Sequence, residues 1–473
     1  MKFYLSFILL CVTFFGCKKD NGSATVDYAY IGGEIINPNT KYVVLSKNET
    51  IIDTINLDGR NRFLYKIKNL SDGIYNFRHG GEYQMVLLEP QDSVLFRLNT
   101  LDFDESLVFS GKGSKKNNYL IETFLESEAE EQYIIKLCQL SAEDYQKHID
   151  SIRDRKTEKF NQFVKKHHPS DLFKDFMQAN INYSYYSSKE VYPFLHYGKN
   201  KAEILKSVPA NFYDYRKDIN YNDVLLSNYH NYMTFLRHSV SNLTLEKHDA
   251  HSTGKPFHRG STCYNLDRLH LIDSLVTNEA IKNELLFKFT MYFLSKSNNE
   301  KNNEAILGSY IEKSTNEKDK DQLTRYVNSI NNLKAGAKLP ELTLISYNKA
   351  EQDLHSIINK PSVISFWSTM HYEHFKKSHK QLRILKEKYP ELKFITINID
   401  GYGIDKSKQI LQGYNFDYSD EYLFKNPDKA IDILAMYPIT KTIIVDRKGK
   451  VVNGNSNIFS ISFEKEVLGL LNR

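Results

Sequence analysis

The chain has few cysteines for its length. Four of its 473 residues are cysteine, and no two form a Cys-x-x-Cys pair. Cys11 and Cys17 lie in an N-terminal segment. Cys138 lies in an apolar run and is expected to be a core residue, whereas the polar stretch around Cys263 predicts a loop. The alternative is a disulfide between these last two. Without disulfides, an exported chain must be stabilised by its hydrophobic cores.

Several motifs typical of catalytic sites are absent from the sequence. The sequence contains no Gly-x-x-x-x-Gly-Lys-Ser/Thr, no Gly-x-Ser-x-Gly and no His-Glu-x-x-His, the marks of phosphate-binding loops, serine hydrolases and zinc proteases. It also has no internal repeat of fixed period. The net charge of +5 is spread along the chain, with an acidic stretch at 122–131 and a basic one at 165–168. Because nucleic-acid binding needs cations clustered on one face, we expect no nucleic-acid partner.

The longest N-terminal apolar run is too short to span a bilayer. It covers residues 3–15 after Met1-Lys2, the length of the apolar part of a signal peptide. Gly16-Cys17 follows at once and resembles a bacterial lipobox. The resemblance implies cleavage before Cys17 and lipid on Cys17, with residues 1–23 forming signal peptide and tether. We therefore expect a cell-envelope protein, lipid-anchored to the outer membrane and facing the periplasm or the surface. The alternative is an ordinary secretory signal.

What the chain does have is enough apolar material for packed domains. The hydrophobic fraction is 41% and the aromatic fraction 13%, and the length suggests about three domains. Residues 24–112 contain short segments rich in β-branched and aromatic residues, separated by turn signals, which predict an antiparallel β-sandwich or barrel. The expected strands are 28–36, 42–45, 49–57, 62–67, 73–79, 83–88, 93–98 and 106–109.

Residues 113–335 have helical periodicity. Ser141 begins a capping-box-like pattern and Ser170 is a second candidate N-cap. One apolar stripe is formed by Leu225, Leu226, Tyr229, Met233 and Leu236. The many tyrosines, including Tyr183, Tyr185, Tyr186, Tyr192 and Tyr197, are interpreted as aromatic packing, with a peptide or glycan platform as the alternative.

A histidine-rich segment interrupts the helical region. His248, His251 and His258 lie close together in sequence, and Gly254 and Pro256 predict a flexible loop. Three histidines could bind a metal, but their spacing matches no strong zinc pattern and no neighbouring cysteine in the sequence assists them. We therefore interpret the segment as a loop.

The C-terminal third carries the clearest fold signal. Residues 363–367 read as a buried strand, and 375–388 as an amphipathic helix with Leu382 and Leu385 inward. Five segments resemble the membrane-anchored thioredoxin-like disulfide reductases of the TlpA and ResA type: 336–344, 360–367, 394–400, 437–440 and 442–452. The resemblance implies a thioredoxin-like domain over 336–473. The expected fold class is thus multi-domain α+β, with an N-terminal antiparallel β-sandwich or barrel, a helical middle region over 113–335 and a C-terminal thioredoxin-like α/β domain.

A second resemblance covers the preceding region. Residues 88–94, 109–113 and 117–120 are similar to a domain of unknown function that often precedes thioredoxin-like domains in anchored bacterial lipoproteins. No catalytic residue is visible in these segments.

The sequence departs from the reductase family at the residues that carry the family's reaction. The two cysteine positions hold His371 and His374, and Met370 and Lys377 replace the family's tryptophan and glutamate. Thiol–disulfide exchange needs a thiolate, and imidazole cannot form a mixed disulfide. Pro438 matches the cis-proline that faces the cysteine pair in the family, and we expect it to be cis and opposite His371.

The histidine pair has two interpretations. Three residues apart at a helix start, His371 and His374 would share one face and stay neutral near the positive helix end. Two histidines make an incomplete zinc site, so we interpret the pair as a remnant or recognition surface, with a weak copper or zinc site as the alternative and no other cofactor. The predicted function is a non-redox binding or structural module of the envelope. It would contact the membrane through its lipid and an unidentified envelope protein or peptide. The alternatives are a thiol–disulfide oxidoreductase and a histidine-based metal-binding module.

Overall fold

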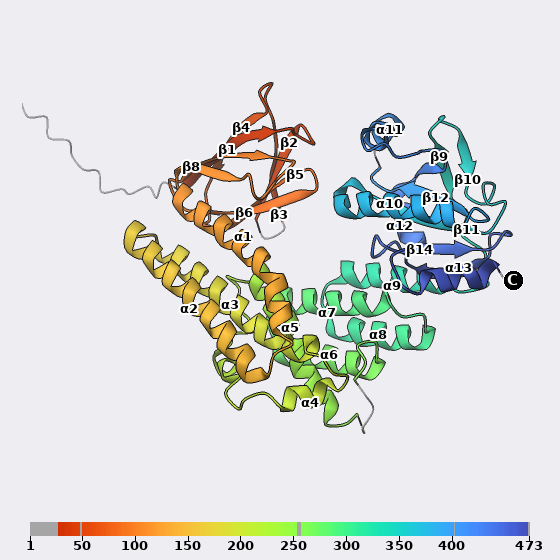
Figure 1. Ribbon diagram of the computed structural model, residues 1–473. Coiled ribbons are helices and arrows are strands. Elements are labelled where there is room, and N and C mark those ends of the chain that lie inside the picture. Colours follow the sequence, from red (N-terminus) through yellow and green to blue (C-terminus); the bar gives the residue numbers. More distant parts are fainter. Residues whose placement is uncertain (1–26, 48–49, 253–256, 402, 472–473) are drawn as a thin grey trace, which may run out of the picture.

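A computed structural model describes residues 27–47, 50–252, 257–401 and 403–471. Figure 1 shows a β domain and a mixed α/β domain resting side by side on a helical base. The predicted signal peptide and tether, residues 1–23 with Cys17, lie outside the described residues. No helix in the described part of the chain is long and apolar enough to cross a membrane.

The N-terminal domain consists of two four-stranded sheets. The first has the order β4-β1-β7-β8 and the second β3-β2-β5-β6. Side chains alternate between buried and exposed along β7, as expected for a strand with one face on a core. The strands are β1 (Tyr28–Ile36), β2 (Tyr42–Lys47), β3 (Thr50–Asn56), β4 (Arg62–Lys68), β5 (Gly73–His79), β6 (Glu82–Leu88), β7 (Ser93–Asn99) and β8 (Val108–Lys112).

The two sheets share one hydrophobic core. Phe77 from the second sheet stacks on Phe96 from the first, with ring centroids 4.4 Å apart. Within the described residues the sheets are not joined into a closed barrel. The antiparallel prediction was wrong in one place, because β1 and β7 pair in parallel. Parallel neighbours need a long crossover, and the chain from β2 to β6 supplies it: β2, β3, β5 and β6 form the other sheet, and β4 pairs with β1.

The segments that resemble a domain of unknown function form the joint between the β domain and the first helix. Lys116 Nζ lies 2.6 Å from Asp92 Oδ2 and also pairs with Glu89. The Asn117 side chain accepts a hydrogen bond from Leu87 N–H and donates one to Leu87 O. Because these groups are largely buried and mutually satisfied, the joint is rigid.

The helical region follows directly. It contains α1 (Ser114–Leu137), α2 (Ala142–His167), α3 (Asp171–Leu195), α4 (Lys201–Lys206), α5 (His230–Asp249), α6 (Thr262–Leu275), α7 (Glu279–Leu294), α8 (Glu300–Lys313) and α9 (Glu317–Asn332), with a 3-10 turn η1 (Asp214–Asp218). Ser141 and Ser170 cap α2 and α3 as predicted, and side chains of Asn200, Ser261, Asn278, Asn299 and Asn316 cap five more.

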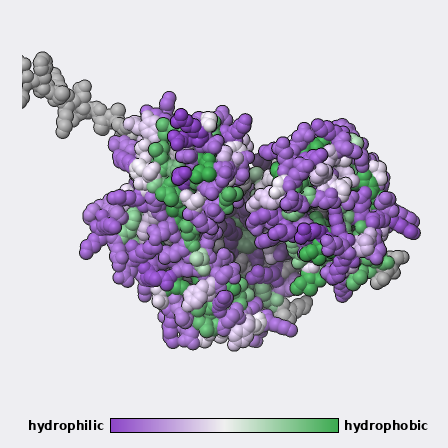
Figure 2. Space-filling model, turned by 45° about the horizontal axis from the view of Figure 1, so that its top comes forward, coloured by the Kyte–Doolittle hydropathy of each residue, from purple (hydrophilic) through white to green (hydrophobic). Residues whose placement is uncertain are grey.

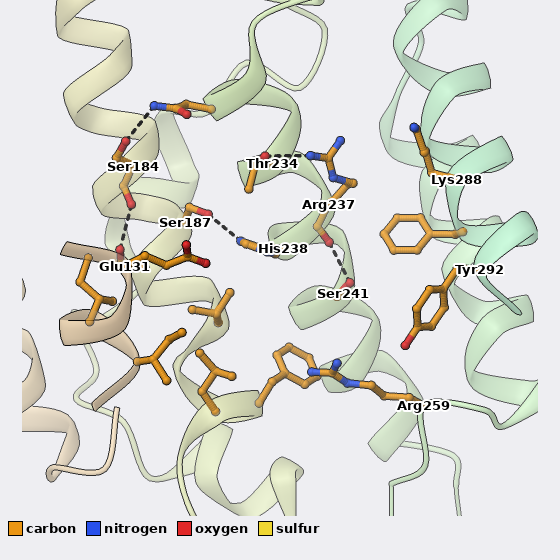
Figure 3. Close-up of a pocket in the computed structure, with 18 of the residues that line it drawn as sticks. Glu131, Ser184, Ser187, Thr234, Arg237, His238, Ser241, Arg259, Lys288 and Tyr292 are labelled. Carbon is orange, nitrogen blue, oxygen red and sulfur yellow. Dashed lines mark hydrogen bonds between the residues drawn. The ribbon is translucent and has the colours of Figure 1, made fainter. Parts of the chain in front are cut away.

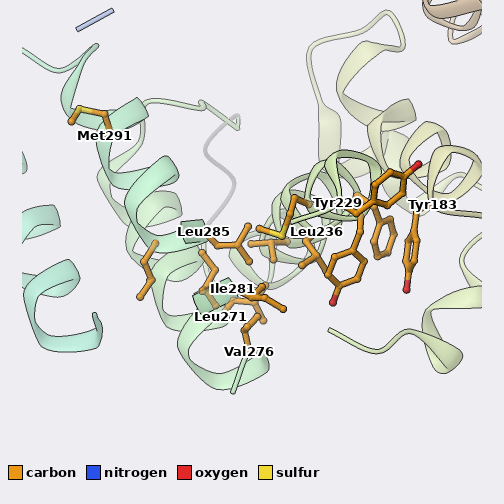
Figure 4. Packing of buried hydrophobic residues seen from close by; sticks show 14 of the residues in the cluster. Tyr183, Tyr229, Leu236, Leu271, Val276, Ile281, Leu285 and Met291 are labelled. Carbon is orange, nitrogen blue, oxygen red and sulfur yellow. The ribbon is translucent and has the colours of Figure 1, made fainter. Parts of the chain in front are cut away.

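A single large core joins α3 and α5 to α6 and α7. Figure 4 shows Tyr183 and Tyr229 at one end of this core and Leu285 and Met291 toward the other. Two predictions were wrong here. Leu225 is 91% exposed in a turn before α5 begins, so it does not belong to the apolar stripe. Cys263 lies in the first turn of α6 rather than in a loop, because Ser261 starts that helix.

The C-terminal domain is a seven-stranded sheet with helices on it. Strand order is β10-β9-β13-β12-β11-β14-β15, with β11 parallel to β12 and antiparallel to β14. The elements are β9 (Thr343–Ser346), β10 (Glu351–Asp353), β11 (Ser362–Trp367), η2 (Thr369–His371), α10 (Tyr372–Lys388), β12 (Lys393–Asn398), α11 (Ile404–Gly413), β13 (Glu421–Phe424), α12 (Pro427–Ile433), β14 (Thr442–Val445), β15 (Val451–Ser456) and α13 (Phe463–Leu471).

Burial explains this topology. Every residue of β11 is buried, as expected for a central strand covered on both faces. Leu382 and Leu385 of α10 pack on Val363 together with α13, whereas Ile364 and Phe366 face a second core. Together with the hairpin of β14 and β15, the arrangement matches the expected thioredoxin-like topology.

The C-terminal domain rests on the last helices of the base. Arg325 of α9 pairs with Asp432 of α12, and Asn455 donates to Ser295 O at the end of α7. Leu333, just after α9, is buried in the core of the C-terminal domain. These contacts fix the domain against α7 to α9.

Candidate functional site

The turn between β11 and α10, residues 368–371, begins the motif that holds the cysteine pair in the reductases. A carboxylate fixes this turn. Asp400, which follows β12, accepts hydrogen bonds from the Ser368 hydroxyl and from both the N–H (2.8 Å) and the hydroxyl (2.9 Å) of Thr369. Because β11 and β12 are parallel neighbours, their carboxyl ends bring Asp400 beside Ser368. The turn is therefore preorganised, and its polar groups find partners within the chain.

The two histidines occupy different environments. His371 is exposed and is the N-cap of α10 without a side-chain capping bond, so α10 begins one residue after it. His374 is half-buried, and burial, with smaller effects of His371 and His379, lowers its pKa to about 4. Its Nδ1 has no hydrogen-bond partner among the described residues. No group of three or more metal-binding side chains in the described chain includes either histidine.

A buried carboxylate lies beneath the turn. Glu421 of β13 accepts a hydrogen bond from Trp367 Nε1 at 2.8 Å, and its other oxygen is 3.3 Å from His379 Nε2. All three side chains are almost fully buried. His379 packs its ring against Phe375 and Phe416. The cluster stabilises the base of the turn and offers no thiol.

The proline loop, residues 437–440, is hydrogen-bonded to the helical base formed by α1 to α9. The Tyr437–Pro438 peptide is cis, as predicted. Tyr437 N–H donates to Ala435 O, and Tyr437 O accepts a hydrogen bond of 2.8 Å from the hydroxyl of Tyr326 on α9. Both backbone groups of Tyr437 are thus occupied by partners within the chain.

The β domain reaches the other side of the turn. A Cβ atom placed on Gly81, between β5 and β6, would lie 3.2 Å from Met370 O and 3.4 Å from Thr369 O. The backbones of the two turns are therefore in close contact. Met370 is still 50% exposed. The contact therefore restrains the turn but leaves it accessible to solvent.

The described cysteines are remote from this turn. Cys138 is the C-cap of α1, and burial raises its thiol pKa to about 11. Cys263 lies on α6, where partial burial and then Asp267 raise its pKa. Both are free, so the disulfide alternative between them is wrong. Neither can replace the missing pair.

A second candidate site lies in the helical base. A cavity of about 710 Å³ is lined by α1, α2, α3, α5, α6 and α7 and by Tyr437 from the proline loop. Figure 2 shows a recess in the middle of the molecule between the lobes, and Figure 3 shows the lining side chains. Five cations line the cavity against the two acids Glu130 and Glu131: Lys156, Arg237, Arg259, Arg268 and Lys288. We call it the arginine pocket.

Arg268 is the most unusual residue of this pocket. It is 5% exposed, and its Nε has no hydrogen-bond partner. Within the described chain it forms no ion pair. Its guanidinium lies between the rings of Tyr264 and Phe289, 4.5 and 4.3 Å from their centroids. Aromatic faces stabilise a cation, but they give its Nε–H no acceptor. A buried polar group of this kind calls for an explanation.

The neighbouring groups add positive potential. Arg237 donates to Thr234 at 2.7 Å and has Glu284 at 3.8 Å, and burial lowers its pKa. Figure 3 shows Arg237 on α5 and Lys288 on α7 extending toward the space between these helices. Burial first, then Arg237 and Arg259, lower the pKa of His238 to about 4. A neutral His238 beside several cations leaves the pocket positive.

Sequence reasoning missed this pocket because its residues come from six helices. One local signal was available. Arg268 lies four residues after Tyr264 and four before Ile272, on the buried side of α6. A charged residue on an apolar helix face is rare unless it is paired, so this position could have been singled out.

Comparisons with known proteins give partial likenesses. No family model matches the chain, and no curated protein matches it. A solved thioredoxin-like protein from Bacteroides caccae is 14% identical, covers 57% of this chain and 94% of its own, and has a TM-score of 0.34. The thioredoxin domain of a thiol-disulfide oxidoreductase from Bacteroides vulgatus is 21% identical over 28% of this chain and 96% of its own, with a TM-score of 0.24.

A thiol peroxidase from Chromobacterium violaceum is similar to a comparable share of the chain. It is 18% identical over 30% of this chain and 88% of its own, with a TM-score of 0.24. Structural neighbours described as oxidoreductases or peroxidases thus share less than a third of the chain. The thioredoxin-like assignment rests on the strand order and the cis proline described above.

Proposed function

We propose that this chain is a lipid-anchored protein of the cell envelope whose thioredoxin-like domain does no thiol redox chemistry. Its task is to bind an anionic small molecule with an apolar body in the arginine pocket. The thioredoxin-like domain then acts as a rigid wall, to which the proline loop contributes Tyr437. The observation that carries the proposal is the buried Arg268, which has donors but no acceptor.

The non-redox part of the proposal is supported by chemistry. Disulfide exchange proceeds through a thiolate that attacks a disulfide sulfur. His371 and His374 have no sulfur, and both described cysteines lie on other helices. The turn is also contacted by Gly81, and Tyr326 occupies the backbone carbonyl of Tyr437.

The choice of ligand follows from the lining. Phe194, Leu195 and Phe289 give the pocket apolar walls, and cations outnumber acids among its lining residues. Ligand pockets are mostly apolar with a few placed polar groups. A carboxylate would receive charge-assisted hydrogen bonds from Arg268, and the aromatic rings beside the guanidinium keep water away, which strengthens them.

Binding of decanoate and decan-1-ol to the full chain tests the proposal. The two probes share an apolar tail and differ in the charge of the head. We expect isothermal titration calorimetry to show decanoate binding at least about tenfold tighter, since a hydrogen bond to a charged group contributes about 1.5–3 kcal/mol.

Two variants sharpen the test. Arg268→Met keeps a long apolar side chain between the rings and removes the donors, so decanoate should bind about tenfold or more weakly. Arg62→Met removes an exposed arginine of β4 that pairs with Glu34, and decanoate binding should be unchanged. Equal binding of the two probes, or equal decanoate binding by wild type and Arg268→Met, would refute the proposal.

A further inference from the structure

We infer that His248, His251, Cys263 and Asp267 form a binding site for a divalent transition metal, with zinc as the ion that fits best. His248 lies in the last turn of α5, and His251 follows three residues later. Cys263 and Asp267 lie four residues apart on α6, so they share one face of that helix. One ligand atom from each of the four lies within 4.8 Å of the others.

The carboxylate of Asp267 is the centre of this group. Its Oδ2 is 2.7 Å from His248 Nδ1, 3.0 Å from His251 Nε2 and 4.0 Å from Cys263 Sγ. With metal–ligand bonds of 2.0–2.3 Å, the donors of a tetrahedral zinc site lie about 3.3–3.7 Å apart. The separations of the ligand atoms would thus have to change by up to about 1 Å to surround an ion, which side-chain rotation can supply.

The donor set also suits the charge of the ion. Two neutral imidazoles, one carboxylate and one thiolate together carry two negative charges, which balance a divalent cation. Cys, His and Asp are all established zinc ligands. The thiol of Cys263 is protonated in the absence of metal, and coordination would release its proton.

The exposure of the four side chains increases from one side of the cluster to the other, as in a metal site that is reached from the surface. The His248 side chain is 10% exposed and packs edge-on against Tyr264, whereas His251 is 50% exposed. The charged groups adjacent to the cluster in sequence are Lys247, Asp249, which pairs with Lys206, and Arg268, which lines the arginine pocket. An ion could enter past His251 and Cys263, and would join the end of α5 to the start of α6.

Titration of the metal-free full chain with Co²⁺ tests the inference, since Co²⁺ substitutes for zinc and reports its ligands by absorption. We expect one Co²⁺ per chain, with the visible bands of tetrahedral cobalt and a thiolate-to-metal charge-transfer band. Zn²⁺ should displace it, release about one proton per ion and raise the thermal midpoint.

Variants identify the ligands. Cys263→Ser should abolish the charge-transfer band, and Asp267→Asn should weaken zinc binding more than about a hundredfold, the upper range for losing even an outer-shell partner. His258→Ala, in the same segment but outside the cluster, should bind like wild type, and so should the double variant His371→Ala/His374→Ala.

Three results would overturn the inference. They are no stoichiometric Co²⁺ binding by the wild type, a spectrum unchanged in Cys263→Ser, and loss of binding in the His371→Ala/His374→Ala variant alone. Circular dichroism of each variant separates lost binding from lost folding.

Discussion

The turn after β11 and the arginine pocket differ in how their polar groups are satisfied. At the turn, Asp400 takes the hydrogen bonds of Ser368 and Thr369, and Glu421 takes that of Trp367. In the pocket, Arg268 is buried and its Nε has no acceptor within the described chain. A turn whose groups are satisfied internally is built to hold its shape, whereas a buried donor without a partner leaves binding energy for a ligand.

The C-terminal domain illustrates the difference between a fold and the chemistry of a site on that fold. The C-terminal domain keeps the strand order, the turn and the cis proline of a thioredoxin-like protein. At the two motif positions it has His371, which is exposed, and the half-buried His374, whose pKa is lowered to about 4 by burial. Function therefore has to be argued from the groups in a site and not from the fold that carries it.

The largest predicted effect tests the structural role of the turn's base. Glu421→Ala removes the acceptor for Trp367 and the partner of His379 and leaves both buried. We expect the free energy of unfolding to fall by about 2–3 kcal/mol, measured by urea denaturation. Glu391→Ala, on an exposed glutamate before β12, should change it by less than about 0.5 kcal/mol. Equal effects of the two substitutions would contradict a structural role for Glu421.

Acid should weaken the fold through two half-buried histidines. Burial lowers the pKa of His374 and of His238 from 6.5 to about 4. Between pH 6.5 and 4 the unfolded chain therefore binds more protons than the native one, so stability falls as the pH is lowered through this window.

Substitution shows whether these histidines are the cause. His374→Gln and His238→Gln should each reduce the dependence of unfolding free energy on pH between 6.5 and 4. His168→Gln, at the exposed end of α2, should leave it as in wild type. An unchanged slope in both test variants would show that other groups govern acid stability.

A smaller effect is expected when Arg268 is replaced in the absence of ligand. Arg268→Met exchanges a desolvated guanidinium for an apolar chain. The gain from avoiding burial of a charge is partly offset by the loss of two cation–π contacts. The free energy of unfolding should stay within about 1 kcal/mol of wild type or rise. A loss of 2 kcal/mol or more would show that Arg268 is structural and not a ligand-binding residue.

The sequence predicted some parts of this structure and not others for physical reasons. Strands such as 28–36 and 73–79 were predicted at their observed bounds because periodicity and turn residues are local signals. The caps at Ser141 and Ser170 are local as well. The parallel pairing of β1 with β7 and the approach of Gly81 to Met370 depend on the path of the chain through space, and no local pattern specifies them.

The same reason explains which sites were found. His371 and His374 were identified because they occupy motif positions. A metal site at His248, His251 and His258 was set aside, since no cysteine stands close in sequence; Cys263 and Asp267 were not considered together with His248 and His251. The structure brings Cys263 to them by packing α6 against α5. The arginine pocket, assembled from six helices, was not predicted at all.

The smallest expected change is in reductase activity, where the account predicts none. The full chain should not accelerate insulin reduction by a thiol donor, and Cys138→Ser and Cys263→Ser should behave like wild type. Turnover above background that disappears in either cysteine variant would restore the oxidoreductase interpretation.

The most direct test of the central claim is to compare the two regions in one titration with decanoate. Arg268→Met removes the unsatisfied donors of the pocket, and His371→Ala/His374→Ala removes the side chains at the motif positions. We expect decanoate binding to weaken about tenfold or more in the first variant and to be unchanged in the second. Weaker binding in the histidine variant together with wild-type binding by Arg268→Met would contradict this expectation.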